Sequence, residues 1–236
     1  MSDIIRFNPN KSVPESVIEG NLIVPDDSIG IVIFAHGSGS SRTSQRNQII
    51  SKILNEHNIG TLLFDLLSRE EQESDRQLEN IQSSVPGAKY NKFNIALLSE
   101  RLLLATKLVL KHTKQKHMGI SYFGSSTGAA AAIVAAGEVR VSCIVARSGR
   151  TDLVENKSLA QISTSCLFIV GEKEKNIIKI NEQTVKMLKN AQEKKIHVVP
   201  NASHMFEEEG SLENVADVSV EWFKKHFEVS VPSLSK

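Results

Sequence analysis

Short apolar runs rich in β-branched residues recur along the chain, and segments with helical periodicity separate them. The runs predict strands at residues 21–24, 31–36, 61–65, 118–123, 141–146, 166–170 and 196–199. Apolar residues spaced three and four apart predict helices at residues 43–57, 93–111, 128–136, 176–191 and 212–227. Alternation of this kind is typical of a mostly parallel sheet covered by helices on both faces. We therefore expect an α/β fold with three layers.

Residues 67–92 break this pattern, because they are polar, charged and interrupted by Pro86 and Gly87. We expect a surface loop with some helix there, either a lid near a site or a mobile connection. The whole chain has 236 residues, of which 40% are hydrophobic, enough to bury one substantial core. This predicts a single domain over residues 1–236.

The charges are almost balanced, with 28 basic and 27 acidic side chains and a formal net charge of +1. No global field therefore favours nucleic acid or an anionic membrane, and a local site must select the partner. No secretory signal or apolar run of membrane-spanning length is found. Cys143 and Cys166 lie in apolar, strand-like stretches and are expected to be buried free thiols, which suits the cytoplasm.

Residues 124–128 have the pattern G-x-S-x-G, between an apolar run and an alanine-rich segment. This pattern permits a sharp strand-to-helix turn that holds its central serine in a strained, exposed conformation. Ser126 is therefore a candidate nucleophile. The alternative is that Ser126 only caps the following helix.

Polar residues follow several of the predicted strands, and ligands of parallel sheets gather at those carboxyl ends. Ser126, Glu174 and His204 each follow a strand, in the chain order serine, acid, histidine. A neutral serine needs a base to remove its proton and an acid to orient that base. His204 and Glu174 supply these residue types, and their order matches that of α/β-hydrolases.

Other residues compete for two of these roles. Glu172 and Asp152 are alternatives for the acid, since each also lies near a predicted strand end. His36 and His197 are alternatives for the base, but His36 precedes a glycine turn and His197 lies within a predicted strand. We expect His36 to support the turn and His197 to be a packed or edge residue.

At these positions the chain resembles the α/β-hydrolase superfamily, and within it the dienelactone hydrolase-like branch. The resemblance is carried by residues 34–47, 61–65, 124–128, 146–153, 167–174 and 201–210. Two positions depart from the branch: Ser126 replaces its cysteine nucleophile, and Glu174 replaces the more usual aspartate. The resemblance implies a hydrolase fold and not dienelactone as the substrate.

The glycine- and serine-rich segment at residues 36–40 allows backbone N–H groups to approach a reacting carbonyl. Its spacing is not that of the phosphate-binding motifs. We expect an oxyanion hole formed by the N–H groups of Ser38 and Thr127. Arg147 and Arg150 follow a predicted strand and are candidate anchors for an acidic substrate, or else surface ion-pair residues.

These observations predict a serine hydrolase that cleaves small carboxylic ester or thioester bonds, with no metal or organic cofactor. The expected partner is a small-molecule ester. Two alternatives remain: a binding protein on the same fold with little or no turnover, and a peptidase or acyltransferase with the same three catalytic residues.

Overall fold

A computed structural model describes residues 2–9, 16–80, 89–113 and 118–230. All strands of these residues join one sheet in the order β1-β2-β4-β3-β5-β6-β7-β8. Their bounds are β1 (Ser2–Phe7), β2 (Ile18–Ile23), β3 (Gly30–Ala35), β4 (Ile59–Phe64), β5 (Gly119–Ser125), β6 (Cys143–Arg147), β7 (Ser165–Gly171) and β8 (Lys194–Val199). Strand β2 is antiparallel to both β1 and β4, and the pairs from β4 to β8 are parallel. The carboxyl ends of β3 to β8 therefore share one edge.

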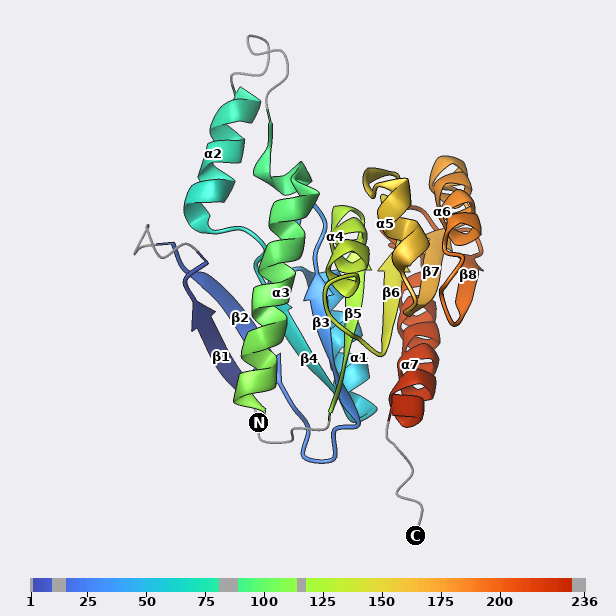
Figure 1. Ribbon diagram of the computed structural model, residues 1–236, viewed down its shortest axis with the longest axis horizontal. Helices are drawn as coiled ribbons and strands as arrows, with labels where there is room; N and C mark the ends of the chain where they lie inside the picture. Colours follow the sequence, from blue (N-terminus) through green and yellow to red (C-terminus); the bar gives the residue numbers. More distant parts are fainter. Residues whose placement is uncertain (1, 10–15, 81–88, 114–117, 231–236) are drawn as a thin grey trace.

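Helices cover both faces of the sheet (Figure 1). Their bounds are α1 (Gln45–Glu56), α2 (Arg69–Asn80), α3 (Ile95–His112), α4 (Thr127–Ala136), α5 (Asn156–Gln161), α6 (Lys175–Met187) and α7 (Ser211–Ser230), with 3-10 turns η1 (Asn91–Phe93) and η2 (Thr151–Leu153). Side chains alternate between the two faces along a strand. In β3, Ile31 and Ile33 pack in the cluster that contains α3 and α4 residues, whereas Val32 packs in the cluster with α1 and α7 residues.

The three-layer α/β architecture expected from the sequence is confirmed. Each predicted strand corresponds to an observed one, with ends that differ by at most three residues; the largest shift is at residues 18–23, predicted as 21–24. Strand β1 and helix α5 were not predicted. Strand β1 lies at the edge of the sheet, and its Ile4 is 66% exposed. The strand forms by pairing with β2 and not by burial of an apolar run, which is the signal that the sequence prediction used.

The polar segment at residues 67–92 contains more helix than loop among its described residues. Helix α2 covers Arg69–Asn80, and residues 81–88 lie outside the described part of the chain. Asp75 is its buried side chain, and the carboxylate accepts hydrogen bonds from the backbone N–H groups of Asn91 and Lys92. This contact fixes α2 against η1, even though α2 has hardly any apolar face to bury.

None of the described helices is long and apolar enough to span a bilayer.

Helix α4 lies unusually close to strand β3, and Gly128 permits this. A Cβ atom at residue 128 would lie 2.0 Å from the carbonyl oxygen of Ala35 and 2.6 Å from that of His36. Gly124 is similarly confined, since a Cβ there would lie 2.5 Å from the Cα of Ala129. The small alanine side chains of α4 are buried in the same contact. The strand-to-helix turn at residue 126 is therefore compact.

We predict that Gly128→Ala lowers the free energy of unfolding by at least about 2 kcal/mol, because the new methyl group meets rigid backbone. Helix propensity alone predicts the opposite sign, a gain of about 1 kcal/mol. Urea unfolding measures the difference. Gly39→Ala is the matched control, since a Cβ atom at residue 39 would have nothing within 4 Å. Equal stabilities of the two variants would contradict the explanation.

Candidate active site

Ser126 occupies the turn between β5 and α4 with a backbone conformation that is rare for a residue with a side chain. Its φ is 52° and its ψ is −119°. Three backbone hydrogen bonds hold it there: its N–H donates to the Arg147 carbonyl, and its own carbonyl accepts from Ala129 and Arg150. Strain of this kind costs about 1–3 kcal/mol and persists only when the surroundings enforce it. Ser126 remains partly exposed, as expected of a nucleophile at such a turn.

Glu174 and His204 are in direct contact. The Nδ1 atom of His204 lies 2.5 Å from Oε1 of Glu174, and Ser148 donates its hydroxyl to Oε2 at 2.5 Å. The side chain of Glu174 is 8% exposed, whereas that of His204 is 45% exposed. Burial by itself would raise the pKa of Glu174, but the hydrogen bonds from His204 and Ser148 outweigh it and hold the pKa below its usual range. Glu174 is therefore an ionised acceptor.

The hydrogen bond to Glu174 also fixes the protonation pattern of the imidazole. An ionised carboxylate can only accept, so Nδ1 of His204 carries the proton in this contact. In the neutral ring the lone pair is then on Nε2. This is the form that can accept a proton from a hydroxyl group.

The loop that carries His204 is held at both sides. Gly171, at the end of β7, lies so close to this loop that a Cβ would be 2.4 Å from the carbonyl oxygen of Ala202. Glu208 accepts hydrogen bonds from the backbone N–H and hydroxyl of Ser203. The Ser203 N–H and Lys173 lower the pKa of Glu208 to about 2. The segment around His204 is thus attached to the end of the sheet.

Ser126 and His204 line one small cavity of about 150 Å³. Its remaining walls come from the β3–α1 loop, the first turn of α1, the ends of β5 and β6, and the His204 loop: Gly37, Ser38, Gly39, Ser40, Arg46, Ser125, Arg147, Ser148 and Met205. The structure therefore brings the candidate nucleophile and base from distant parts of the chain to one cavity, and Glu174 lies on the other side of the imidazole.

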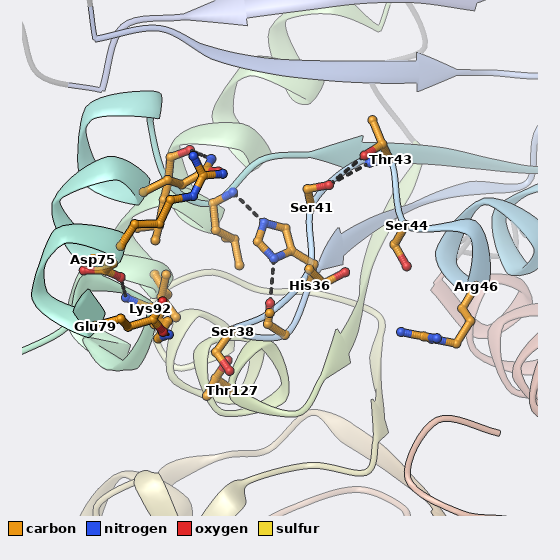
Figure 2. A pocket seen from close by; sticks show the side chains of 18 of the residues that line it. His36, Ser38, Ser41, Thr43, Ser44, Arg46, Asp75, Glu79, Lys92 and Thr127 are labelled. Carbon is orange, nitrogen blue, oxygen red and sulfur yellow. Dashed lines mark hydrogen bonds and ion pairs between the residues drawn. The ribbon is translucent and has the colours of Figure 1, made fainter. Parts of the chain in front are cut away.

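A larger cavity of about 570 Å³ adjoins the small one, and the two share residues 37–40 and Arg46. Figure 2 shows this larger cavity, which both Ser38 and Thr127 line. Thr127 is the first residue of α4, where backbone N–H groups have no partner within the helix. Helix α2 supplies the opposite wall with Gln72, Asp75, Arg76 and Glu79. The lining is mainly polar.

His36 supports the turn before Ser38, as the sequence predicted. Its Nε2 accepts a hydrogen bond from the N–H of Leu66, and its Nδ1 lies 2.9 Å from the carbonyl oxygen of Gly37. Burial lowers the pKa of His36, so the neutral ring is favoured. His36 therefore connects the ends of β3 and β4 and fixes the segment that carries Ser38.

The alternative acids and the remaining histidine have other partners. Glu172 accepts a hydrogen bond from the backbone N–H of Asn201, and Asp152 forms an ion pair with Arg150. His197 lies in the edge strand β8, as predicted, with Nε2 at 2.7 Å from Asn214 Oδ1. Of the three candidate acids, Glu174 is the one in contact with His204.

The two candidate arginines differ sharply. Arg150 is 39% exposed and donates two hydrogen bonds of 2.8 Å to Asp152. Arg147 is buried and lines the small cavity. The structure therefore brings Arg147, and not Arg150, to the wall of the cavity that contains Ser126.

Sequence reasoning missed Ser148 as part of this arrangement. Its φ of 44° turns the chain after β6, its N–H donates to the Ile169 carbonyl, and its hydroxyl reaches Glu174. Its place directly after a predicted strand, within the block at residues 146–153, was the available signal.

The prediction for the two cysteines is confirmed, because Cys143 and Cys166 are both free and buried. Burial raises the pKa of the Cys143 thiol strongly and that of Cys166 to about 12. Neither thiol lines the cavity that contains Ser126.

Comparison with known proteins gives a family match and close structural relatives. The model of the dienelactone hydrolase family matches residues 18–227. The crystal structure of a dienelactone hydrolase from Anabaena variabilis is 36% identical, covers 95% of this chain and 98% of its own, and superposes with a TM-score of 0.82. The Pyrococcus furiosus esterase Pf2001 is 17% identical, with 96% and 93% covered and a TM-score of 0.75, so it shows a shared fold.

Two curated relatives from strains of Mycobacterium tuberculosis carry a different name. Each is called a putative phosphoribosyl transferase and is 38% identical over 211 residues. The match covers 89% of this chain but 44% of each relative. The chain therefore spans less than half the length of these proteins.

We predict that neither cysteine reacts with the disulfide reagent DTNB while the protein is folded, because a buried thiol stays protonated. Both should react once the protein is unfolded in guanidinium chloride. Absorbance of the released thiolate measures the two stages. Rapid reaction of either thiol in the folded protein would contradict the burial described here.

Proposed function

This chain belongs to the dienelactone hydrolase family, and we propose that it is a serine hydrolase that cleaves small carboxylic ester or thioester bonds. The observation that carries the proposal is the contact of His204 with Glu174 at the cavity that also contains Ser126. Nucleophile, base and acid are the three groups that acyl transfer through a serine requires.

In the proposed mechanism Ser126 Oγ attacks the substrate carbonyl while Nε2 of His204 takes the hydroxyl proton. The ring becomes an imidazolium, and the Glu174 carboxylate at Nδ1 stabilises that charge. The second oxygen of Glu174 accepts from Ser148, which prevents the carboxylate from rotating away. His204 then returns the proton to the leaving alkoxide or thiolate. Water activated by His204 releases the acid in the second half of the reaction.

The backbone N–H groups of Ser38 and Thr127 are proposed to bind the negative oxygen of the tetrahedral intermediate. Both residues line the larger cavity, and Ser38 also lines the cavity of Ser126. Each correctly placed donor lowers the barrier by about 3 kcal/mol. The buried His36 fixes the turn that carries Ser38, so this donor needs no rearrangement during the reaction.

We also propose that the substrate is small, because the cavity that Ser126 lines has a volume of about 150 Å³. The phosphoribosyl transferase name of the M. tuberculosis relatives is not carried over, since the match covers 44% of each of them.

We predict that Ser126→Ala reduces ester hydrolysis by at least about 10³-fold, because the acyl-enzyme can no longer form. The measurement is kcat/KM on short-acyl, long-acyl, lactone and thioester substrates. Wild-type protein should also be labelled at Ser126 by a fluorophosphonate, identified by mass spectrometry. Undiminished turnover in the variant would reject the serine mechanism. Folded wild-type protein that neither reacts nor turns over would instead favour a binding protein.

We predict that Glu174→Gln lowers kcat by about 10³- to 10⁴-fold, because the amide cannot stabilise the imidazolium and can favour the wrong tautomer. Glu172→Gln and Asp152→Asn, which have other hydrogen-bond partners, should change kcat by less than about 5-fold. Circular dichroism confirms that each variant folds. A large loss in one of the latter two, with an active Glu174→Gln, would move the acid to that residue.

A further inference from the structure

Helix α6 buries its polar side chains more deeply than its apolar ones. Asn181 is 0% exposed and Thr184 is 3% exposed, whereas the isoleucines of this helix are only partly buried. A polar group loses its hydrogen bonds to water when it is buried, so it needs partners inside the protein. The partners of Asn181 and Thr184 therefore indicate what the two side chains do.

The amide group of Asn181 reaches out of its helix to the segment that follows β6. Its Nδ2 atom donates to the Ile177 carbonyl at 2.7 Å and to the Gly149 carbonyl at 3.0 Å. Its Oδ1 atom is buried and has no hydrogen-bond partner among the described residues. An unpaired buried acceptor costs stability, and an apolar side chain would avoid that cost. The contact with Gly149 is therefore the feature that explains an asparagine at this position.

The carbonyl of Gly149 belongs to the same peptide group as the N–H of Arg150. That N–H donates to the Ser126 carbonyl at 3.1 Å. Because a peptide group is planar, its carbonyl and its N–H keep a fixed relative direction. One rigid unit thus accepts a hydrogen bond from Asn181 and donates one to the strained turn of the nucleophile. Each bond polarises the peptide group in the direction that strengthens the other.

Gly149 is also packed between two helices. A Cβ atom on Gly149 would lie 3.1 Å from the Cβ atom of Ala129 in α4 and 3.3 Å from Oδ1 of Asn181 in α6. A side chain at this position would therefore push against both helices. The peptide group that follows Gly149 is confined by packing as well as by hydrogen bonds.

We propose that Asn181 is a positioning residue for the nucleophile. It orients the peptide group between Gly149 and Arg150, and this group holds the Ser126 carbonyl so that the turn keeps its positive φ. Neither Asn181 nor Gly149 lines the two cavities of the site, so the effect on the reaction is indirect. The inference rests on the proposed function and deepens it, since it names a residue outside the cavities on which the position of the hydroxyl depends.

Thr184 offers a matched comparison, one turn further along α6. Its hydroxyl donates to the Ile180 carbonyl, so the Thr151 hydroxyl is the donor in the 2.7 Å contact between the two threonines. This contact also joins α6 to the segment after β6, but it does not involve the peptide group that holds Ser126. Loss of the Thr184 hydroxyl should therefore cost stability without moving the nucleophile.

The experiment compares Asn181→Ala with Thr184→Ala, which remove two buried polar side chains from one face of one helix. We expect Asn181→Ala to lower kcat on a short-acyl ester by about 10- to 100-fold, because a displacement of reacting groups by about 1 Å costs a factor of that size. KM should stay within about 3-fold, since no residue of the cavities changes. Thr184→Ala should keep kcat within about 3-fold, because the nucleophile stays in place. Urea unfolding measures the stability that each variant loses.

Asn181→Ser is a second variant that tests the proposal even if Asn181→Ala does not fold. A serine hydroxyl can donate to the Ile177 carbonyl, as Thr184 does to Ile180, but it is too short to reach Gly149. Asn181→Ser should therefore lower kcat as Asn181→Ala does.

Two further measurements report on the turn itself. The rate constant of fluorophosphonate labelling at Ser126 should fall in Asn181→Ala by about the same factor as kcat, since labelling uses the same hydroxyl. Exchange of the Arg150 amide hydrogen, followed by NMR without substrate, should be at least about 10-fold faster in Asn181→Ala than in Thr184→Ala. The reason is that the N–H is then held less firmly against the Ser126 carbonyl.

Unchanged kcat and unchanged Arg150 exchange in the folded Asn181 variants would overturn the inference and leave the serine mechanism intact. Equal losses of kcat in Asn181→Ala and Thr184→Ala would also overturn it, because both side chains would then only pack the segment. If wild-type protein neither hydrolyses an ester nor is labelled, the proposed function fails. Exchange at Arg150 then decides by itself whether Asn181 holds the turn of Ser126.

Discussion

The close contact between helix α4 and strand β3 is the constraint on which the rest of the site depends. Gly128 lets the first turn of the helix lie against the carbonyl of Ala35, where a side chain has no space. The chain must therefore turn within one residue, and Ser126 takes a positive φ to do so. Backbone hydrogen bonds from the neighbouring strand end hold this strained conformation. Packing between two elements thus places the hydroxyl group at the rim of the sheet.

The parallel order of the sheet brings the other groups to the same rim. Ser148, Glu174 and His204 come after β6, β7 and β8, and each contacts the next through a hydrogen bond. Gly171 lets the His204 loop approach the end of β7, much as Gly128 lets α4 approach β3. The carboxylate is buried and ionised while the imidazole stays accessible. The buried carboxylate of Glu174 suits an acid that orients the imidazole, and the exposed imidazole of His204 suits a base that contacts the substrate.

Charge is distributed unevenly over this rim, although the chain as a whole is nearly neutral. Most of the cations near the site have acidic partners, as Arg150 has in Asp152 and Arg42 has in Glu19 and Asp65. Arg147 departs from that pattern, because its buried guanidinium faces aromatic rings and a cavity.

Periodicity and turn chemistry in the sequence were sufficient to predict the three-layer α/β fold and the strand-to-helix turn at Ser126, because these signals are local. The hydrolase family was indicated by the resemblance of several sequence blocks to that family. These signals did not reveal β1, which its partner strand defines, and they left the acid open between Glu174, Glu172 and Asp152. Tertiary structure alone decided that His204 contacts Glu174 and that the Nη1 atom of Arg147 is buried with no acceptor among the described residues. His204 and Glu174 are 30 residues apart in the chain. Their contact therefore depends on how the loops pack at the end of the sheet, and no pattern within a single segment predicts it.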